Sequence, residues 1–205
     1  MLVVHHLSFS RSTRILWLLE ELGLAYEIVH HARDAKFKAP PSLGSIHPLG
    51  KAPVINDGGL VLAESAVILT YINVKYGSGR FAPSVNSEAF FQHEEWLHYA
   101  ESTAAFPIMT MRVGALTGGL GSALKDFVTP TLWKTLDHIS HPLRAGDYLM
   151  GGQFTLADIQ MAYLLEIASQ SGLLENYPLL PNYLERLKSR PAFLKAAAVG
   201  GPMLP

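Results

Sequence analysis

The sequence contains no cysteine among its 205 residues. Disulfides, thiolate metal sites and a cysteine nucleophile supplied by the chain are therefore excluded, so any thiol chemistry must come from a ligand. An excess of charge of one sign is also lacking, because 16 Lys and Arg oppose 17 Asp and Glu, for a net charge of −1. Nucleic acid is not an expected partner, since contacts with phosphates dominate that kind of binding.

Long hydrophobic runs are absent as well. No apolar run reaches the roughly 20 residues that a membrane-spanning helix needs. Residues 1–6 lack the basic and apolar regions of a signal peptide, so we expect a cytoplasmic protein with no membrane partner. With 49% hydrophobic and 16% charged residues, the chain can bury one large core or two small ones.

The first part of the chain has the pattern of an α/β domain. Leu2–Leu7 predicts a short strand, and apolar residues then recur at helical spacing from Ile15 to Leu22. Gly23 stands where a glycine commonly ends a helix. A second strand over Ala25–His30 completes a βαβ unit with parallel strands.

The pattern continues with a loop, a hairpin and a helix. Residues 32–49 predict a loop with room for one short helix. Asp57-Gly58-Gly59 separates two strands that should be antiparallel. A helix then runs from Glu64 to about Tyr76, and Gly77-Ser78-Gly79 ends it. The predicted order is therefore β-α-β, a loop with its short helix, and β-β-α.

From Ser87 onward no strand pattern recurs, and helical periodicities predict an all-helical domain. We place the first domain at residues 1–78, a linker at 79–87 and the helical domain at 88–205. The sharpest local signal is Thr155-Leu156-Ala157-Asp158, which has the form of a capping box with aspartate in place of glutamate. A stabilising role of about 1 kcal/mol is expected for it.

Three segments of the first domain carry candidate chemistry. Ser8–Ser12 and Glu64-Ser65 each stand at the start of a helix, where free N–H groups and the helix dipole favour an anion such as a thiolate or carboxylate. Leu49–Pro53 enters a strand at a proline, which cannot donate to the ladder. If the Ala52–Pro53 bond is cis, an extended peptide could pair with this edge as an added strand.

Together these segments resemble the cytosolic glutathione S-transferase family, of the serine type known from bacteria and fungi. The resemblance rests on residues 10–22, residues 48–53 and Glu64-Ser65 in the family's order, and on the box at residues 155–158. It implies a thioredoxin-like βαβαββα N-terminal domain that binds glutathione, followed by an all-helical C-terminal domain. It also implies a homodimeric detoxification enzyme that adds glutathione, as cosubstrate, to small electrophilic apolar substrates.

The resemblance also implies roles for single residues in glutathione binding. Pro53 would be cis, and Ala52 would pair with the cysteinyl backbone of glutathione. Lys51 would hold the glycyl carboxylate, while Glu64 and Ser65 would hold the γ-glutamyl end.

The resemblance assigns activation of the thiol to a serine, because residues 1–21 contain neither tyrosine nor cysteine. Ser10 is the first choice, with Ser8 and Ser12 close behind. Ser10 could instead be the N-cap of the first helix, which would be its ordinary structural role.

Further residues could support the site. Arg11 or Arg14 could add positive potential, although an arginine in a first helical turn is commonly solvated or salt-bridged. Tyr99, Phe106 and Met109 could line a pocket for the electrophile, although apolar stripes of this kind are usually core.

The nine histidines do not predict a metal site, because the chain has neither cysteine nor an HExxH pattern. Only His138 and His141 share a helical face. Two other functions remain open beside conjugation. One is glutathione-dependent reduction of peroxides or disulfides, and the other is a non-catalytic interaction module on the same fold.

Overall fold

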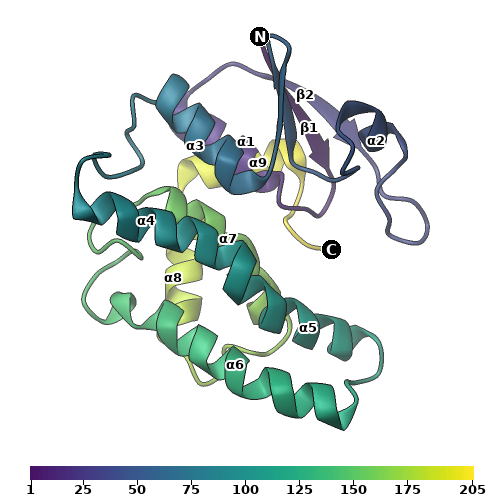
Figure 1. Cartoon of the computed structure of the whole chain (residues 1–205), viewed down its shortest axis with the longest axis vertical. Coiled ribbons are helices and arrows are strands. Elements are labelled where there is room, and N and C mark those ends of the chain that lie inside the picture. Colours follow the sequence, from purple (N-terminus) through teal and green to yellow (C-terminus); the bar gives the residue numbers. More distant parts are fainter. The chain divides into compact units, whose positions relative to one another are not determined.

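The computed structural model describes residues 1–205 and divides into two compact units. The first comprises Met1–Phe81 together with Lys188–Pro205, and the second comprises Ala82–Leu187. The elements of the first unit are labelled in Figure 1 where there is room, and in chain order they are β1 (Leu2–Leu7), α1 (Thr13–Leu22), β2 (Glu27–His31), α2 (Ser42–Ile46), β3 (Val54–Asp57), β4 (Leu60–Ala63), α3 (Ser65–Lys75) and α9 (Pro191–Gly200).

The four strands form one mixed sheet in the order β2-β1-β3-β4. β1 pairs in parallel with β2 and antiparallel with β3, and β3 pairs antiparallel with β4. Gly58 and Gly59 connect β3 to β4 with φ angles of 60° and 98°, a region that glycine enters without a steric penalty. The predicted βαβ unit and hairpin are confirmed, and α2 is the short helix of the predicted loop.

Helix α1 supplies much of the core of the first unit. Its residues Ile15–Leu19 are all buried. Gly23 follows the helix in the left-handed conformation, and its N–H reaches the carbonyl oxygens of Leu19 and Glu20. The predicted end of this helix is therefore confirmed.

Helix α9 packs in the first unit, whereas the sequence placed all of residues 88–205 in the helical domain. The rings of Trp17 in α1 and Phe193 in α9 meet edge to face, with centroids 5.0 Å apart. Arg190 also donates two hydrogen bonds to the Glu21 carboxylate, at 2.6 and 2.9 Å. The last helix is held by these contacts with α1, so residues 188–205 pack with the first unit although they follow the helical region in the sequence.

The second unit is entirely helical apart from one isolated bridge between Tyr148 and Gly151. Helix α7 is its most buried element, and residues 156–165 are all buried in it. The predicted capping box is present at the start of α7. α5 and α6 lie side by side (Figure 1). The elements are α4 (Glu88–Tyr99), the π-helical turn η1 (Ala100–Ala104), α5 (Ala105–Leu116), α6 (Ser122–Ser140), the 3-10 turn η2 (Pro142–Arg144), α7 (Leu156–Gln170) and α8 (Leu179–Lys188).

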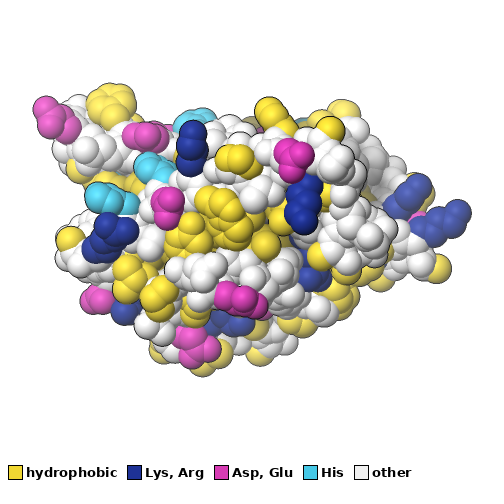
Figure 2. Space-filling model, turned by 90° about the horizontal axis from the view of Figure 1, so that it is seen from below, with side chains coloured by type: hydrophobic (Ala, Val, Ile, Leu, Met, Phe, Trp, Pro, Cys, Tyr) yellow, Lys and Arg dark blue, Asp and Glu magenta, His cyan; other side chains and the backbone are white.

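The surface mixes charge of both signs with apolar side chains. On the face drawn in Figure 2, Lys and Arg side chains are scattered rather than gathered in one stripe, and hydrophobic patches lie between them. The structure has no helix of the length and apolarity needed to cross a bilayer.

Candidate functional site

The N-termini of α1 and α3 are tied together by one buried hydrogen bond. Arg14 Nη1 donates to Ser65 Oγ at 2.9 Å, and both residues are buried. Arg14 is only 1% exposed, so it is not the solvated first-turn arginine that its position in α1 suggested. Because helix N-termini carry free N–H groups and partial positive charge, this bond connects two helix ends that can each favour an anion.

The hydroxyl groups of Ser10 and Ser12 are buried and hydrogen-bonded to each other at 2.7 Å. Ser10 Oγ also lies 2.7 Å from the carbonyl oxygen of Leu7 and accepts from the Ser12 N–H at 3.2 Å. Ser12 Oγ accepts from the Leu7 N–H at 3.2 Å and contacts His6 Nδ1 at 2.8 Å. Ser8 is half-buried, and no partner is present for its hydroxyl. Of the three candidate serines, Ser12 is thus the most fully engaged inside the protein.

The start of α1 bears on the capping role considered for Ser10. Ser12 occupies the N-cap position, and its side chain makes no capping hydrogen bond. Ser10 Oγ accepts from the N–H of Ser12, two residues further on, which is the hydrogen bond of a capping side chain, so the structural role considered for Ser10 stands beside the proposed chemical one.

His6 joins this cluster from β1. Its side chain is fully buried, and its Nε2 lies 2.8 Å from the carbonyl oxygen of Gly200 at the end of α9. Burial lowers the pKa of His6, while the hydrogen bond to Gly200 acts in the opposite direction. The sequence did not indicate this contact, because the two residues are 194 positions apart.

The segment before β3 contains the cis peptide bond expected from the resemblance. The Ala52–Pro53 peptide bond is cis, which confirms that expectation. Pro53 is buried, Ala52 is half-buried and the Lys51 side chain is exposed. Lys51 therefore projects a charged ammonium group into solvent next to the start of β3.

Glu64 has a strained backbone immediately before α3. Its φ angle is 69° with ψ of 114°, although it is not glycine. Such a conformation costs on the order of 1–3 kcal/mol. Residues that retain a strained backbone conformation are found preferentially at binding sites. The Glu64 side chain is exposed, whereas the next residue, Ser65, is buried.

The residues proposed for an electrophile pocket lie in the helical unit. Tyr99 in α4 packs edge to face against His138, with ring centroids 4.8 Å apart, and burial raises its pKa. In α5, Phe106 is 49% exposed and Met109 is half-buried. A π-helical turn separates α4 from α5, which the sequence did not predict; such turns often occur at functional positions.

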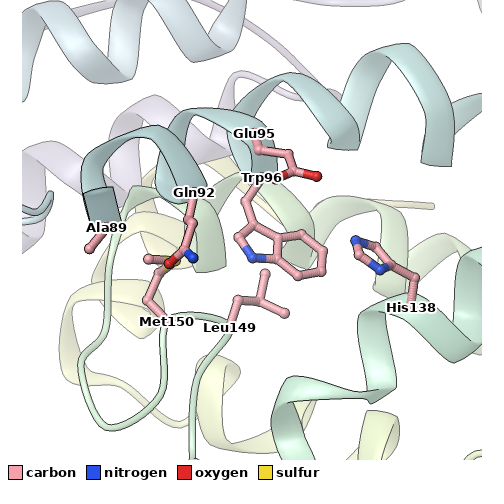
Figure 3. Close-up of a pocket in the computed structure, with 7 residues that line it drawn as sticks. All are labelled: Ala89, Gln92, Glu95, Trp96, His138, Leu149 and Met150. Carbon is pink, nitrogen blue, oxygen red and sulfur yellow. The ribbon is translucent and has the colours of Figure 1, made fainter. Parts of the chain in front are cut away.

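A cavity of about 330 Å³ opens beside this aromatic cluster. Figure 3 shows the Trp96 indole lying next to the His138 ring above Leu149, with Gln92 and Met150 on the opposite side. The Trp96 and His138 rings stack with centroids 4.7 Å apart. The structure contains no group of three or more His, Cys, Asp or Glu that could hold a metal ion.

The fold and these residues define a two-domain protein with a thioredoxin-like N-terminal domain followed by a helical domain. The family model for the glutathione S-transferase N-terminal domain matches residues 1–74, and that for the glutathione S-transferase C-terminal domain matches residues 121–196.

Similar proteins agree with these matches. Glutathione S-transferase 3 of Schizosaccharomyces pombe is 34% identical over 96% of this chain and 87% of its own length. Glutathione S-transferase 1 of Saccharomyces cerevisiae is 30% identical over 96% of each chain. A crystal structure of a glutathione S-transferase from Actinobacillus pleuropneumoniae superposes with a TM-score of 0.88 at 32% identity, covering 98% of this chain and 93% of that one. The chain therefore belongs to the glutathione S-transferase family.

Proposed function

We propose that this protein, a glutathione transferase by family, stabilises glutathione as its thiolate beside Ser10 and adds the sulfur to electrophilic apolar substrates. The observation that carries the proposal is the buried bond from Arg14 to Ser65, since it brings the N-terminus of α3 to that of α1, where Ser10 lies. The protein has no sulfhydryl of its own, so the reacting sulfur is that of glutathione.

The energies involved are compatible with this role. Lowering a thiol pKa from about 8.5 to the mid-sixes requires roughly 2.7 kcal/mol of preferential thiolate stabilisation. A hydroxyl that donates to a charged acceptor contributes about 1.5–3 kcal/mol, and a helix N-terminus contributes about 0.3–2 kcal/mol. One serine hydroxyl and the start of α1 together supply about 2–5 kcal/mol, a range that includes the required stabilisation.

The rest of glutathione would be held by residues around the two helix ends. In this proposal the Ser65 hydroxyl, oriented by Arg14, and the exposed Glu64 carboxylate bind the γ-glutamyl end. Lys51 binds the glycyl carboxylate, and the backbone of Ala52 pairs with the cysteinyl residue. The strained φ of Glu64 supports a binding role at this turn.

Ser10 is favoured over Ser12 by its surroundings. Ser12 is 0% exposed, and its hydroxyl contacts His6, Ser10 and Leu7. Ser8 has an unengaged hydroxyl, so it is the stronger competitor. Arg11, which is half-buried, remains a proposed source of positive potential near the thiolate.

Titration of the protein with glutathione and with S-methylglutathione in a calorimeter tests the binding proposal. Both ligands should bind, because the methyl group replaces only the thiol proton. Absence of binding at millimolar ligand would refute the function. Given binding, thiolate absorbance across a pH series should report a lowered thiol pKa in the wild-type complex.

Two variants test which serine stabilises the glutathione thiolate. Ser10→Ala should raise the thiol pKa in the complex by about one to two units, as expected from losing one hydrogen bond to a charged acceptor. Ser8→Ala is the matched control and should leave that pKa in place. The reverse pattern would transfer the role to Ser8.

The electrophile pocket is proposed around Tyr99, Phe106 and Met109, on α4 and α5. Substitution of Phe106 by Ala should raise KM for an apolar electrophile such as 1-chloro-2,4-dinitrobenzene more than it changes the Kd of glutathione. Turnover of an organic hydroperoxide or a mixed disulfide in the same assays measures the reductase alternative directly.

We further propose a cytoplasmic homodimer with a role in detoxification. Support for self-association comes from apolar side chains exposed on α3, Val67 and Val74, and from Phe91 on α4, which is 68% exposed. Light scattering should give twice the monomer mass of 22.4 kDa. A monomer at micromolar concentration would refute the dimer, and cell fractionation tests the compartment.

A further inference from the structure

His6 is held in one tautomer by the end of α9. Its Nε2 lies 2.8 Å from the Gly200 carbonyl oxygen, which can only accept a hydrogen bond, so Nε2 carries a proton. Burial lowers the pKa of this imidazole, so at rest the ring is neutral and its Nδ1 is an acceptor. The only side chain bonded to that Nδ1 is Ser12, at 2.8 Å.

The tautomer of His6 fixes the direction of the next two hydrogen bonds. Ser12 must donate its hydroxyl proton to His6, so Ser12 Oγ is left as an acceptor for the Leu7 N–H and for Ser10. Ser10 therefore directs its own proton inward, toward Ser12 Oγ or the Leu7 carbonyl oxygen. In this state Ser10 offers a ligand an acceptor and no donor.

A thiolate needs the opposite arrangement, because it must accept a hydrogen bond from Ser10. We propose that His6, Ser12 and Ser10 form a relay that takes the proton of the glutathione thiol to His6 Nδ1, with His6 acting as a positioning residue. The inference rests on the proposed function of Ser10 and adds the destination of the proton.

The transfer balances without any further reactant. The S–H bond of glutathione breaks and its proton moves to Ser10 Oγ; the Ser10 proton moves to Ser12 Oγ, and the Ser12 proton moves to His6 Nδ1. The sulfur keeps the electron pair as thiolate and now accepts from Ser10. His6 becomes an imidazolium whose Nε2–H still donates to Gly200, and the thiolate at the other end of the chain supplies the negative charge that favours this imidazolium against the effect of burial.

The surroundings of His6 contain no carboxylate bonded to the ring that would protonate it in the absence of ligand. The His30 ring lies 5.5 Å away on β2, and His30 and His31 both disfavour a positive charge on His6. Asp57 on β3 is bonded to Lys75, and Glu21 on α1 is bonded to Arg190. The other charged groups on the elements around His6 are Glu27 on β2, Arg14 and Glu20 on α1, and the exposed Lys195 on α9.

Nuclear magnetic resonance of protein with isotopically labelled histidine tests the relay in the wild type. Bound glutathione at neutral pH should convert the His6 resonances from neutral imidazole to imidazolium. S-methylglutathione has no thiol proton to give, so it should leave His6 neutral while occupying the same site. A neutral His6 in a complex that shows thiolate absorbance would overturn the relay, because the hydroxyl groups would then have reoriented without a proton reaching the histidine.

The thiol pKa of glutathione bound to two variants gives a second test of the relay. Ser12→Ala should raise the thiol pKa in the complex by about one unit, which is roughly tenfold less thiolate at neutral pH. His30→Gln is the opposing variant: it removes an imidazole that disfavours a positive charge on His6 and leaves the chain of hydrogen bonds intact, so it should not raise the thiol pKa. Equal thiol pKa values in wild type and Ser12→Ala would refute the relay while glutathione binding remained. Failure of the wild type to bind glutathione or S-methylglutathione in the calorimeter would instead refute the proposed function.

Discussion

Replacement of Asp158 by alanine should destabilise the helical unit far more than the loss of an ordinary helix cap. The carboxylate is fully buried and accepts four hydrogen bonds. Two come from Thr155, through its N–H at 2.7 Å and its hydroxyl at 3.1 Å. The others come from the Leu149 N–H at 3.0 Å and from the Tyr183 hydroxyl. Asp158 thus joins the start of α7 to α8 and to the preceding loop.

The magnitude follows from what the alanine would leave behind. Two backbone N–H groups and the hydroxyl of Tyr183 would lose their acceptor in the interior, and each such group costs about 1–3 kcal/mol. Burial raises the pKa of Asp158, so removing the carboxylate also relieves a desolvation penalty, which places the net loss at about 3–5 kcal/mol. That is a large fraction of the roughly 5–15 kcal/mol that stabilises a typical domain.

Urea unfolding followed by circular dichroism measures this loss. Ser87→Ala is the matched control, because Ser87 caps α4 in the same unit through one bond, from the Phe90 N–H at 3.3 Å. The control should lose only about 0.5–2 kcal/mol. A loss for Asp158→Ala within the control's range of about 0.5–2 kcal/mol would show that the residue acts only as a cap and that its other hydrogen bonds add nothing.

Three further outcomes are expected. Burial lowers the folded-state pKa of His93 below its unfolded value near 6.5. The stability that neutral His93 contributes is therefore present above that pH and is lost as pH falls, by up to about 1.4 kcal/mol per pH unit. His93→Leu should make the free energy of unfolding depend less on pH in the acid range. Arg14→Met should weaken glutathione binding roughly tenfold, and a calorimetric double-mutant cycle with Ser65→Ala should show coupling rather than additivity. A Cβ at Gly200 would lie 2.5 Å from Leu16 Cδ1, so Gly200→Ala should cost about 1–3 kcal/mol in urea, whereas Gly152→Ala, with open space around it, should be near neutral.

The parts of the fold that depend on local pattern could be predicted from the sequence. The apolar spacing of α1, its end at Gly23 and the box at the start of α7 all reflect interactions within a few residues. The consecutive glycines Gly58 and Gly59 likewise indicate a tight turn, whose positive φ angles few other residue pairs accommodate. Such signals identify elements and their ends without knowledge of what packs against them.

Contacts between distant segments could not be predicted in the same way. The apolar pattern of α9 indicates a helix, but nothing in it specifies that Phe193 meets Trp17 rather than a helix of the second unit. The burial of Arg14 depends on the position of Ser65, which is set only when α3 packs beside α1. The pattern of α8 likewise places Tyr183 on the apolar face of the helix, but it does not indicate that the Tyr183 hydroxyl donates to Asp158.

The two buried polar clusters differ in a way that separates stability from chemistry. Each oxygen of Asp158 accepts two hydrogen bonds from the protein, so that cluster has no capacity left for a ligand. The cluster of His6, Ser12 and Ser10 is satisfied at its inner end by Gly200, whereas Ser10 Oγ accepts only the Ser12 N–H and keeps one lone pair. A polar network that is complete on its own rigidifies a core, while one with a single unfilled position at a helix N-terminus is completed by the ligand it binds. This difference supports the proposed role of Ser10 in thiol chemistry, whereas Asp158 serves the architecture of the helical unit.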